Sequence, residues 1–169
     1  MTSNAQKLDT WIRHDFKQIN TQLEELYNSL DTPDDIAGVG KALKTQLTNE
    51  GSSLLKALLD EGNTDQGFDR GFDLLGNVGF FMAACRRHEI DELKTPELVP
   101  SLQVASALSL QLGASLGVVP RFASAHLETH NKAIAGSYKS FTELDDEALF
   151  LEYNTRGVFA FIRASEALL

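Results

Sequence analysis

The chain has 169 residues, 43% of them hydrophobic, and a formal net charge of −9. This is enough apolar sequence for a hydrophobic core, so an intrinsically disordered protein is excluded and we predict a single domain, residues 1–169. The acidic balance argues against nucleic acid and against an anionic membrane surface as the main partner, because both attract basic patches. No charged and apolar leader opens the chain, and no apolar run approaches the roughly 18 residues of a membrane span, so we expect a cytoplasmic protein.

The first half of the chain has apolar residues at spacings of three and four, which is typical of amphipathic helices. The first helix is predicted over residues 8–30 and ends before Pro33. The second is predicted over residues 36–60, with a kink at Gly51, and the third over residues 68–88.

The third predicted helix is unusually rich in glycine, at Gly67, Gly71, Gly76 and Gly79. Each glycine inside a helix costs about 1 kcal/mol of helix propensity relative to alanine, so another group is expected to approach this backbone closely. That group is a neighbouring helix in the simplest interpretation, and a ligand or a partner chain in the alternatives. We therefore predict Gly76 and Gly79 as interface positions. Cys85, the only cysteine, excludes an internal disulfide and is predicted to be a small packing residue.

The second half predicts three more helices. Residues 102–116 form a mostly buried helix, and a shorter helix follows Pro120 to about residue 131. Thr142 is predicted to cap the last helix, with Asp145 completing a variant of the capping box. Because no strand-like alternation is present anywhere, the sequence predicts an all-α bundle of about six helices.

Chemically interesting side chains gather in residues 119–150, within the connection between two predicted helices. Loops held by a rigid scaffold often carry function, so these side chains are candidates for a small-molecule site. The candidate substrate-binding residues are His126, His130, Asn131, Tyr138 and Phe141.

A metal site is a weaker interpretation of the same histidines. His126 and His130 are four residues apart and would share a helical face, which suits a metal. However, a metalloprotease motif needs Glu at the position that Leu127 occupies, and no third ligand is evident, so we predict no intrinsic metal site. No nucleophile motif is present either.

Three segments carry a resemblance to a known family. They are G-F-F-M-A-A-C-R-R-H-E at 79–89, P-S-L-Q-V-A-S-A-L-S-L-Q-L-G at 100–113, and S-Y-K-S-F-T-E-L-D-D-E at 137–147. Together with His126 and Asn131, they resemble the N-terminal half of the monodechloroaminopyrrolnitrin synthase family, which acts in secondary metabolism. That family belongs to the indoleamine and tryptophan dioxygenase superfamily. The resemblance implies an all-helical fold, haem as cofactor and an indole substrate.

One departure from the family shapes the functional expectation. The histidine that ligates haem iron in that family lies in the C-terminal half, beyond the segment that Leu169 ends here. The resemblance therefore implies a hetero-oligomer, in which a second polypeptide carries the haem-binding half and this chain covers the pocket for an indole or aromatic amine. The alternative is a non-catalytic helical binding or interaction protein that retains only the scaffold.

Overall fold

The computed structural model describes residues 2–32, 36, 38–62, 67–89, 100–134 and 136–168. Within these ranges the chain is all-α, which confirms the predicted fold class; the β-type pairing there is one isolated bridge between Ile134 and Ser137. Six longer helices and one single turn are present: α1 (Ser3–Arg13), α2 (Asp15–Asn28), α3 (Lys41–Glu61), α4 (Phe68–Glu89), α5 (Pro100–Leu116), α6 (Ser124–Leu127) and α7 (Asp145–Leu168).

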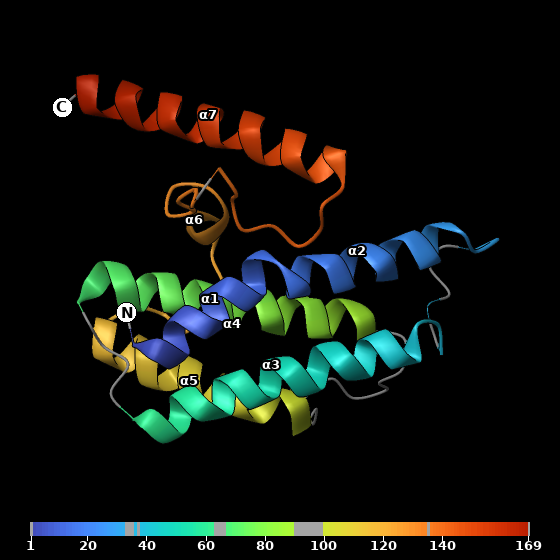
Figure 1. Ribbon diagram of the computed structural model, residues 1–169. Coiled ribbons are helices and arrows are strands. Elements are labelled where there is room, and N and C mark those ends of the chain that lie inside the picture. The colour runs from blue at the N-terminus through green and yellow to red at the C-terminus, as the bar shows by residue number, and fades with distance from the viewer. Residues whose placement is uncertain are drawn as a thin grey trace.

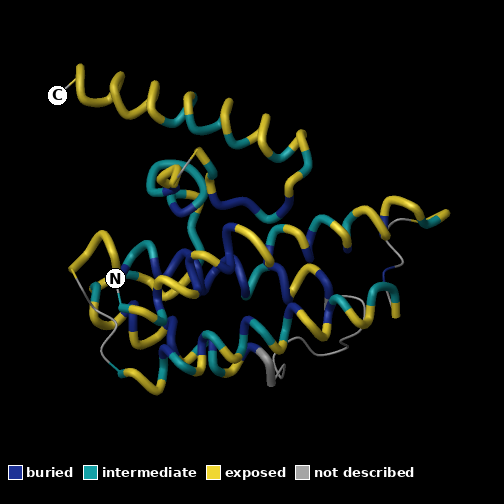
Figure 2. The backbone as a smooth tube through the Cα atoms, in the orientation of Figure 1, coloured by how far each residue is buried: buried dark blue, intermediate teal, exposed yellow. Residues whose placement is uncertain are grey.

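Helices α1 to α5 form the body of the molecule, and α7 lies along one side of it, with α6 and its loops between them (Figure 1). Helix α4 packs closely on α5, α3 also packs on α5, and α1 contacts α2, α3 and α4. Their apolar faces meet in one core, which is buried in Figure 2. Among the largest fully buried side chains are Phe16, Leu23, Leu55, Phe80 and Phe81.

The first predicted helix is in fact two helices. His14 has φ −126° and ψ −86°, which are not helical values, and it separates α1 from α2. The break is one residue long, so the spacing of four residues from Ile12 to Phe16 is still the spacing expected on the apolar face of one continuous helix. Periodicity alone therefore could not detect it.

The second predicted helix begins later than expected. Gly38 and Gly40 have φ values of +73° and +65°, a left-handed conformation that glycine adopts readily, and α3 starts only at Lys41. The helix then continues through Gly51, where the absence of a side chain leaves room for the ring of Phe81. Pro33 and the connection 90–99 lie outside the described residues.

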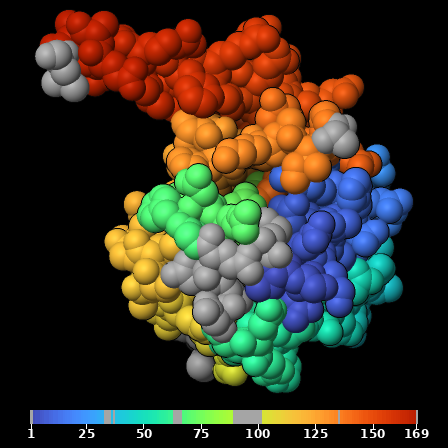
Figure 3. Space-filling model, turned by 60° about the vertical axis from the view of Figure 1, so that its left-hand side comes forward, coloured from blue at the N-terminus to red at the C-terminus, as the bar shows by residue number. Residues whose placement is uncertain are grey.

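The last helix has an unusual environment for its composition. No described residue of α7 is buried, and its C-terminal half projects beyond the body (Figure 3). Among the described helices, none combines the length and hydrophobicity that crossing a bilayer requires.

Candidate functional site

The candidate site is built around the connection between α5 and α7, and His126 is its most enclosed side chain. The imidazole is stacked on Phe72, with ring centroids 4.1 Å apart, and on Phe122, at 5.5 Å. Its Nδ1 accepts a hydrogen bond of 3.0 Å from the Ala123 N–H. Gly76 makes room for the ring, because a Cβ there would lie 2.8 Å from the His126 Cδ2.

The electrostatics of His126 follow from this enclosure. Burial lowers the pKa of His126 to about 4, and the nearby His130 and Lys139 act in the same direction. The backbones of Ala123 and Phe72 partly oppose the shift, but no hydrogen bond reaches the buried Nε2. His126 is therefore a neutral ring at physiological pH.

His130 reaches the same aromatic cluster from outside. Its ring meets Phe72 edge-on at 4.8 Å, and its Nδ1 is 3.0 Å from the Thr129 hydroxyl. The predicted shared helical face is wrong, because α6 ends at Leu127 and the chain then turns. The two histidines are brought together by Phe72 instead.

Asn131 holds the loop in shape. Its Nδ2 donates to the carbonyls of Leu127 and Lys139, at 3.1 and 2.6 Å, and its Oδ1 accepts from the Lys139 N–H at 2.9 Å. The side chain is buried, and its amide is occupied by these three bonds. Asn131 thus braces the loop from within.

A buried ionic network then fixes this loop to the body. The Lys139 ammonium lies 2.9 Å from an Asp9 carboxylate oxygen and 2.6 Å from one of Asp73, while Arg13 Nε donates to Asp9 at 2.9 Å. Arg13 also donates to the backbone carbonyls of Ser137 and Lys132. Burial alone would raise the pKa of Asp9, but the Lys139 and Arg13 cations outweigh it and hold the pKa below its usual value.

The start of α7 is held by Glu147, not by the predicted capping box. The Glu147 carboxylate accepts from the Phe141 N–H, the Thr142 N–H and the Thr142 hydroxyl, at 2.6, 2.7 and 2.6 Å. Asp145 takes no part in these bonds, because the helix begins at that residue. The predicted Thr142–Asp145 pairing is therefore wrong.

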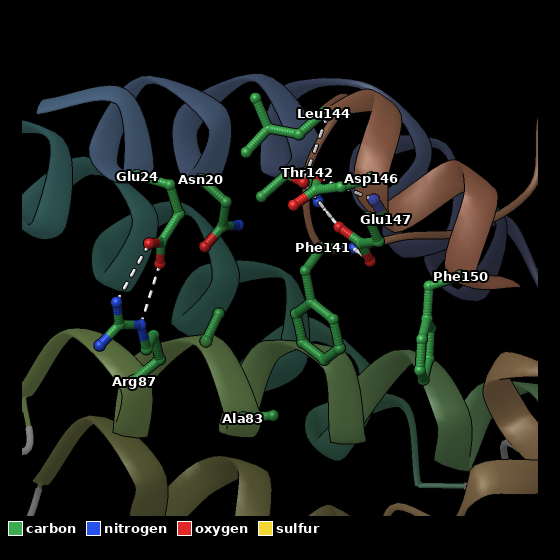
Figure 4. Close-up of a pocket in the computed structure, with 11 residues that line it drawn as sticks. Asn20, Glu24, Ala83, Arg87, Phe141, Thr142, Leu144, Asp146, Glu147 and Phe150 are labelled. Carbon is green, nitrogen blue, oxygen red and sulfur yellow. Dashed lines mark hydrogen bonds and ion pairs between the residues drawn. The ribbon is translucent and has the colours of Figure 1, made fainter. Parts of the chain in front are cut away.

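Two open grooves flank this connection. The α4 groove, of about 650 Å³, lies between α2, α4 and the start of α7 (Figure 4). Phe141 and Phe150 form apolar walls, and the Glu24–Arg87 ion pair, 3.0 Å long, lies at one end. The loop groove, of about 610 Å³, lies between residues 127–140 and α7, and Asn131 and Tyr138 are among the residues that line it.

The structure thus divides the five predicted substrate-binding residues among three places. His126 and His130 belong to the aromatic cluster of Phe72, Asn131 and Tyr138 border the loop groove, and Phe141 lines the α4 groove. Whether they bind a substrate stays a prediction. The roles of Lys139, Asp9 and Arg13 were not predicted, since a buried ion cannot be told from a surface charge in a sequence. Phe72 was not predicted either, since it looks like any other apolar residue of a helical face.

The two predicted interface glycines are closely packed within the chain itself. A Cβ on Gly79 would lie 2.7 Å from the Cβ of Phe122, and Gly76 meets His126. Gly71 contacts Leu116 of α5 in the same way. A contact of Gly76 or Gly79 with a second chain stays a prediction.

Haem iron takes as few as one axial ligand from the protein, so a single histidine would be enough to hold it. No group of three or more potential metal ligands occurs among the described residues. His88 uses both ring nitrogens, toward the Tyr27 hydroxyl at 2.9 Å and the Asn20 side chain at 2.7 Å. His126 is stacked between two phenylalanine rings, and Cys85 is buried in the core. His14 is exposed at a helix break, and His130 is half-buried beside Phe72.

Known proteins resemble this chain at the level of a family. No curated protein matches the chain. The family model described as monodechloroaminopyrrolnitrin synthase PrnB matches residues 2–169, which is nearly the whole sequence. The chain therefore belongs to the monodechloroaminopyrrolnitrin synthase PrnB family.

Proposed function

We propose that this chain forms one wall of the substrate pocket of a haem-dependent oxygenase, and that a second polypeptide carries the haem-ligating half. Membership of the family makes the chain a relative of haem-dependent oxygenases. The proposed substrate is an indole or a related aromatic amine. No reaction step is assigned to this chain.

The observation that carries this proposal is the bracing of the loop at residues 131–142. Three side-chain bonds of Asn131 and the buried Lys139–Asp9 pair fix its backbone, while the Tyr138 side chain next to them is 57% exposed. A rigid loop that presents an aromatic hydroxyl to a groove suits the wall of a binding pocket. His126 and His130 would support this wall from behind through Phe72.

A second candidate function is a non-catalytic helical binding protein. The observation that favours it is that the two buried histidines are held within the chain, His88 through both ring nitrogens and His126 between two phenylalanine rings. The two functions differ in a simple property, since a haem-enzyme subunit must form a coloured complex with some partner and a bare scaffold need not.

The experiment is an absorption spectrum of the purified chain with haemin, alone and after co-expression with the polypeptides encoded next to it. We expect no Soret band from the chain alone and a Soret band with the partner. In that complex, Tyr138→Ala should weaken binding of an aromatic amine and leave the Soret band intact. A Soret band from the isolated chain that His126→Ala or His130→Ala abolishes would place the iron ligand here, and the two-chain proposal would be dropped.

A further inference from the structure

Helix α7 is apolar around most of its circumference. At about 100° per residue, Phe150, Gly157, Phe161 and Leu168 fall within about 20° of one line along the helix, with Tyr153 beside them. The charged residues Glu152, Arg156 and Arg163 gather within about 40° on the opposite side. A helix with so wide an apolar arc is normally covered on more than one side.

The body covers only part of that arc. Phe161 is 80% exposed, Tyr153 64% and Phe150 58%. With about 150–250 Å² for a whole aromatic side chain, these three leave about 400 Å² of apolar surface open. Leu168 lies on the same line and is 88% exposed, so it extends the open stripe toward the end of the helix. A stripe of this size is comparable to the largest apolar patch of a typical monomer, about 300–600 Å², and such patches are often functional.

This stripe is continuous with the α4 groove. Phe150 belongs to both, and in Figure 4 its ring and the ring of Phe141 both point toward α4, with Phe141 on the side nearer Ala83. We call these residues together the α7 docking surface: Phe150, Tyr153, Gly157 and Phe161 of the stripe, with Phe141 and Ala83 of the groove. Nothing lies within 4 Å of a Cβ placed on Gly157, so the middle of the stripe is open for close approach.

Charge around this surface indicates which kind of partner fits. Asp145, Asp146 and Glu147 crowd the first turn of α7, and the chain carries a net charge of −9. In a parallel pair of α7 helices from two copies these carboxylates would face each other. In an antiparallel pair they would face the last turn, residues 165–168, which offers no cation to them. A second copy is disfavoured in both arrangements.

We propose that the α7 docking surface binds an amphipathic helix of a second, different polypeptide, whose apolar face is bordered by Lys or Arg. The inference rests on the proposed function, because it says where the second polypeptide of that proposal docks. Apolar side chains of the partner helix would cover Phe150, Tyr153 and Phe161. Its cations would lie against the acidic first turn, which sets their orientation along α7.

The test uses a labelled amphipathic peptide of Leu and Lys, about five helical turns long, with a Leu–Glu peptide of the same pattern beside it. Binding to the full chain is measured by fluorescence anisotropy. Phe161→Glu and Arg163→Gln form a matched pair, because each makes the net charge of the chain more negative by one. Phe161 lies on the apolar stripe, and Arg163 lies on the polar face of α7. Circular dichroism checks that both variants keep their helix content.

We expect the Leu–Lys peptide to bind the parent and Arg163→Gln, and to bind Phe161→Glu at least about tenfold more weakly. The double variant Asp145→Asn, Asp146→Asn should also weaken binding and reduce its dependence on salt. Tighter binding to Phe161→Glu would mean attraction by charge alone and would overturn the proposal. If the Leu–Glu peptide binds as tightly as the Leu–Lys peptide, the claim that Lys or Arg borders the apolar face of the partner helix is overturned.

Light scattering addresses the remaining occupant, a second copy. A dimer of the chain that Phe161→Glu dissociates would replace the proposed partner with self-association. Failure of the docking surface can be told apart from failure of the proposed function. If Phe161→Glu still binds the peptide and a co-expressed partner still yields a Soret band, the docking surface is wrong and the proposed function stands. If the peptide binds as expected and no partner yields a Soret band, the docking surface stands and the function is wrong.

Discussion

Replacing Gly79 with Leu tests whether the loop before α6 is seated directly on the backbone of α4. Even a Cβ at this position would lie 2.7 Å from the Cβ of Phe122 and 2.9 Å from its Cγ, closer than carbon atoms approach. Phe122 has little room to retreat, because its ring packs at 5.0 Å from Phe80 and 6.0 Å from Phe141. The added side chain must therefore displace a connected aromatic cluster.

The size of the effect follows from two opposing contributions. Overpacking a core contact costs about 1–3 kcal/mol. The better helix propensity of Leu offsets up to about 1 kcal/mol of that. We therefore expect Gly79→Leu to lower the free energy of unfolding by up to about 2 kcal/mol. The assay is urea denaturation followed by fluorescence of the single tryptophan, Trp11, which is buried in the core.

Two variants make the result specific. Gly157→Leu adds the same side chain to a helix at a position with open space around it, so it should gain helix propensity without a clash and leave the unfolding midpoint unchanged or raised. Phe122→Ala combined with Gly79→Leu should cost less than the sum of the single changes, because the clash is then removed. A Gly79→Leu protein as stable as the Gly157→Leu protein would refute the close contact.

Three further predictions concern buried polar groups. Burial lowers the pKa of both His88 and His126 to about 4, so between pH 6.5 and 4 the unfolded chain binds more protons than the folded chain, and the free energy of unfolding falls as pH falls, by up to roughly 3 kcal/mol for each histidine. His126→Phe should reduce this pH dependence in denaturation at several pH values. An unchanged pH dependence would exclude His126 as a contributor. Lys139→Met should lower the free energy of unfolding by about 3–5 kcal/mol, because the buried Asp9 carboxylate then loses one of its cations. Adding Asp9→Asn should recover part of this loss, and no recovery would argue against the Lys139–Asp9 ion pair. Asn131→Ala should speed hydrogen exchange of the loop amides at 131–142 without changing that of the core, whereas unchanged loop exchange would show that its three bonds do not hold the loop.

Much of the fold was predictable because the spacing of apolar residues is a direct signal of a helix. The third predicted helix, residues 68–88, differs from α4 by one residue, and the helix at 102–116 differs from α5 by two. The break at His14 was not predictable, since one non-helical residue hardly disturbs that spacing. The late start of α3 was signalled only by Gly38 and Gly40, whose left-handed conformation depends on the fold around them.

The site was less predictable, because its organisation depends on contacts between distant segments. The sequence singled out His126 and Asn131, yet their roles come from Phe72 and Lys139, which are ordinary residues in a linear reading. Asp9 and Lys139 are 130 residues apart and meet only when α1 and the loop pack on α4. Local patterns identify the apolar faces of long helices, but they carry no information on such pairs.

The buried ions give a reason to regard this loop as a built surface. Two carboxylates, the buried Asp9 and the partly exposed Asp73, and two buried cations, Arg13 and Lys139, balance in charge within one cluster. Burying such groups contributes little net stability, because desolvation offsets most of the attraction. What the cluster does is connect the loop to the body, because the Lys139 ammonium contacts Asp9 of α1 and Asp73 of α4 at the same time. The exposed Tyr138 adjoins Lys139 in sequence, so its backbone is fixed by the same contacts. The loop groove separates this surface from the Glu152 and Arg156 side of α7. A surface held this firmly is organised for a specific contact, as the proposed pocket wall requires.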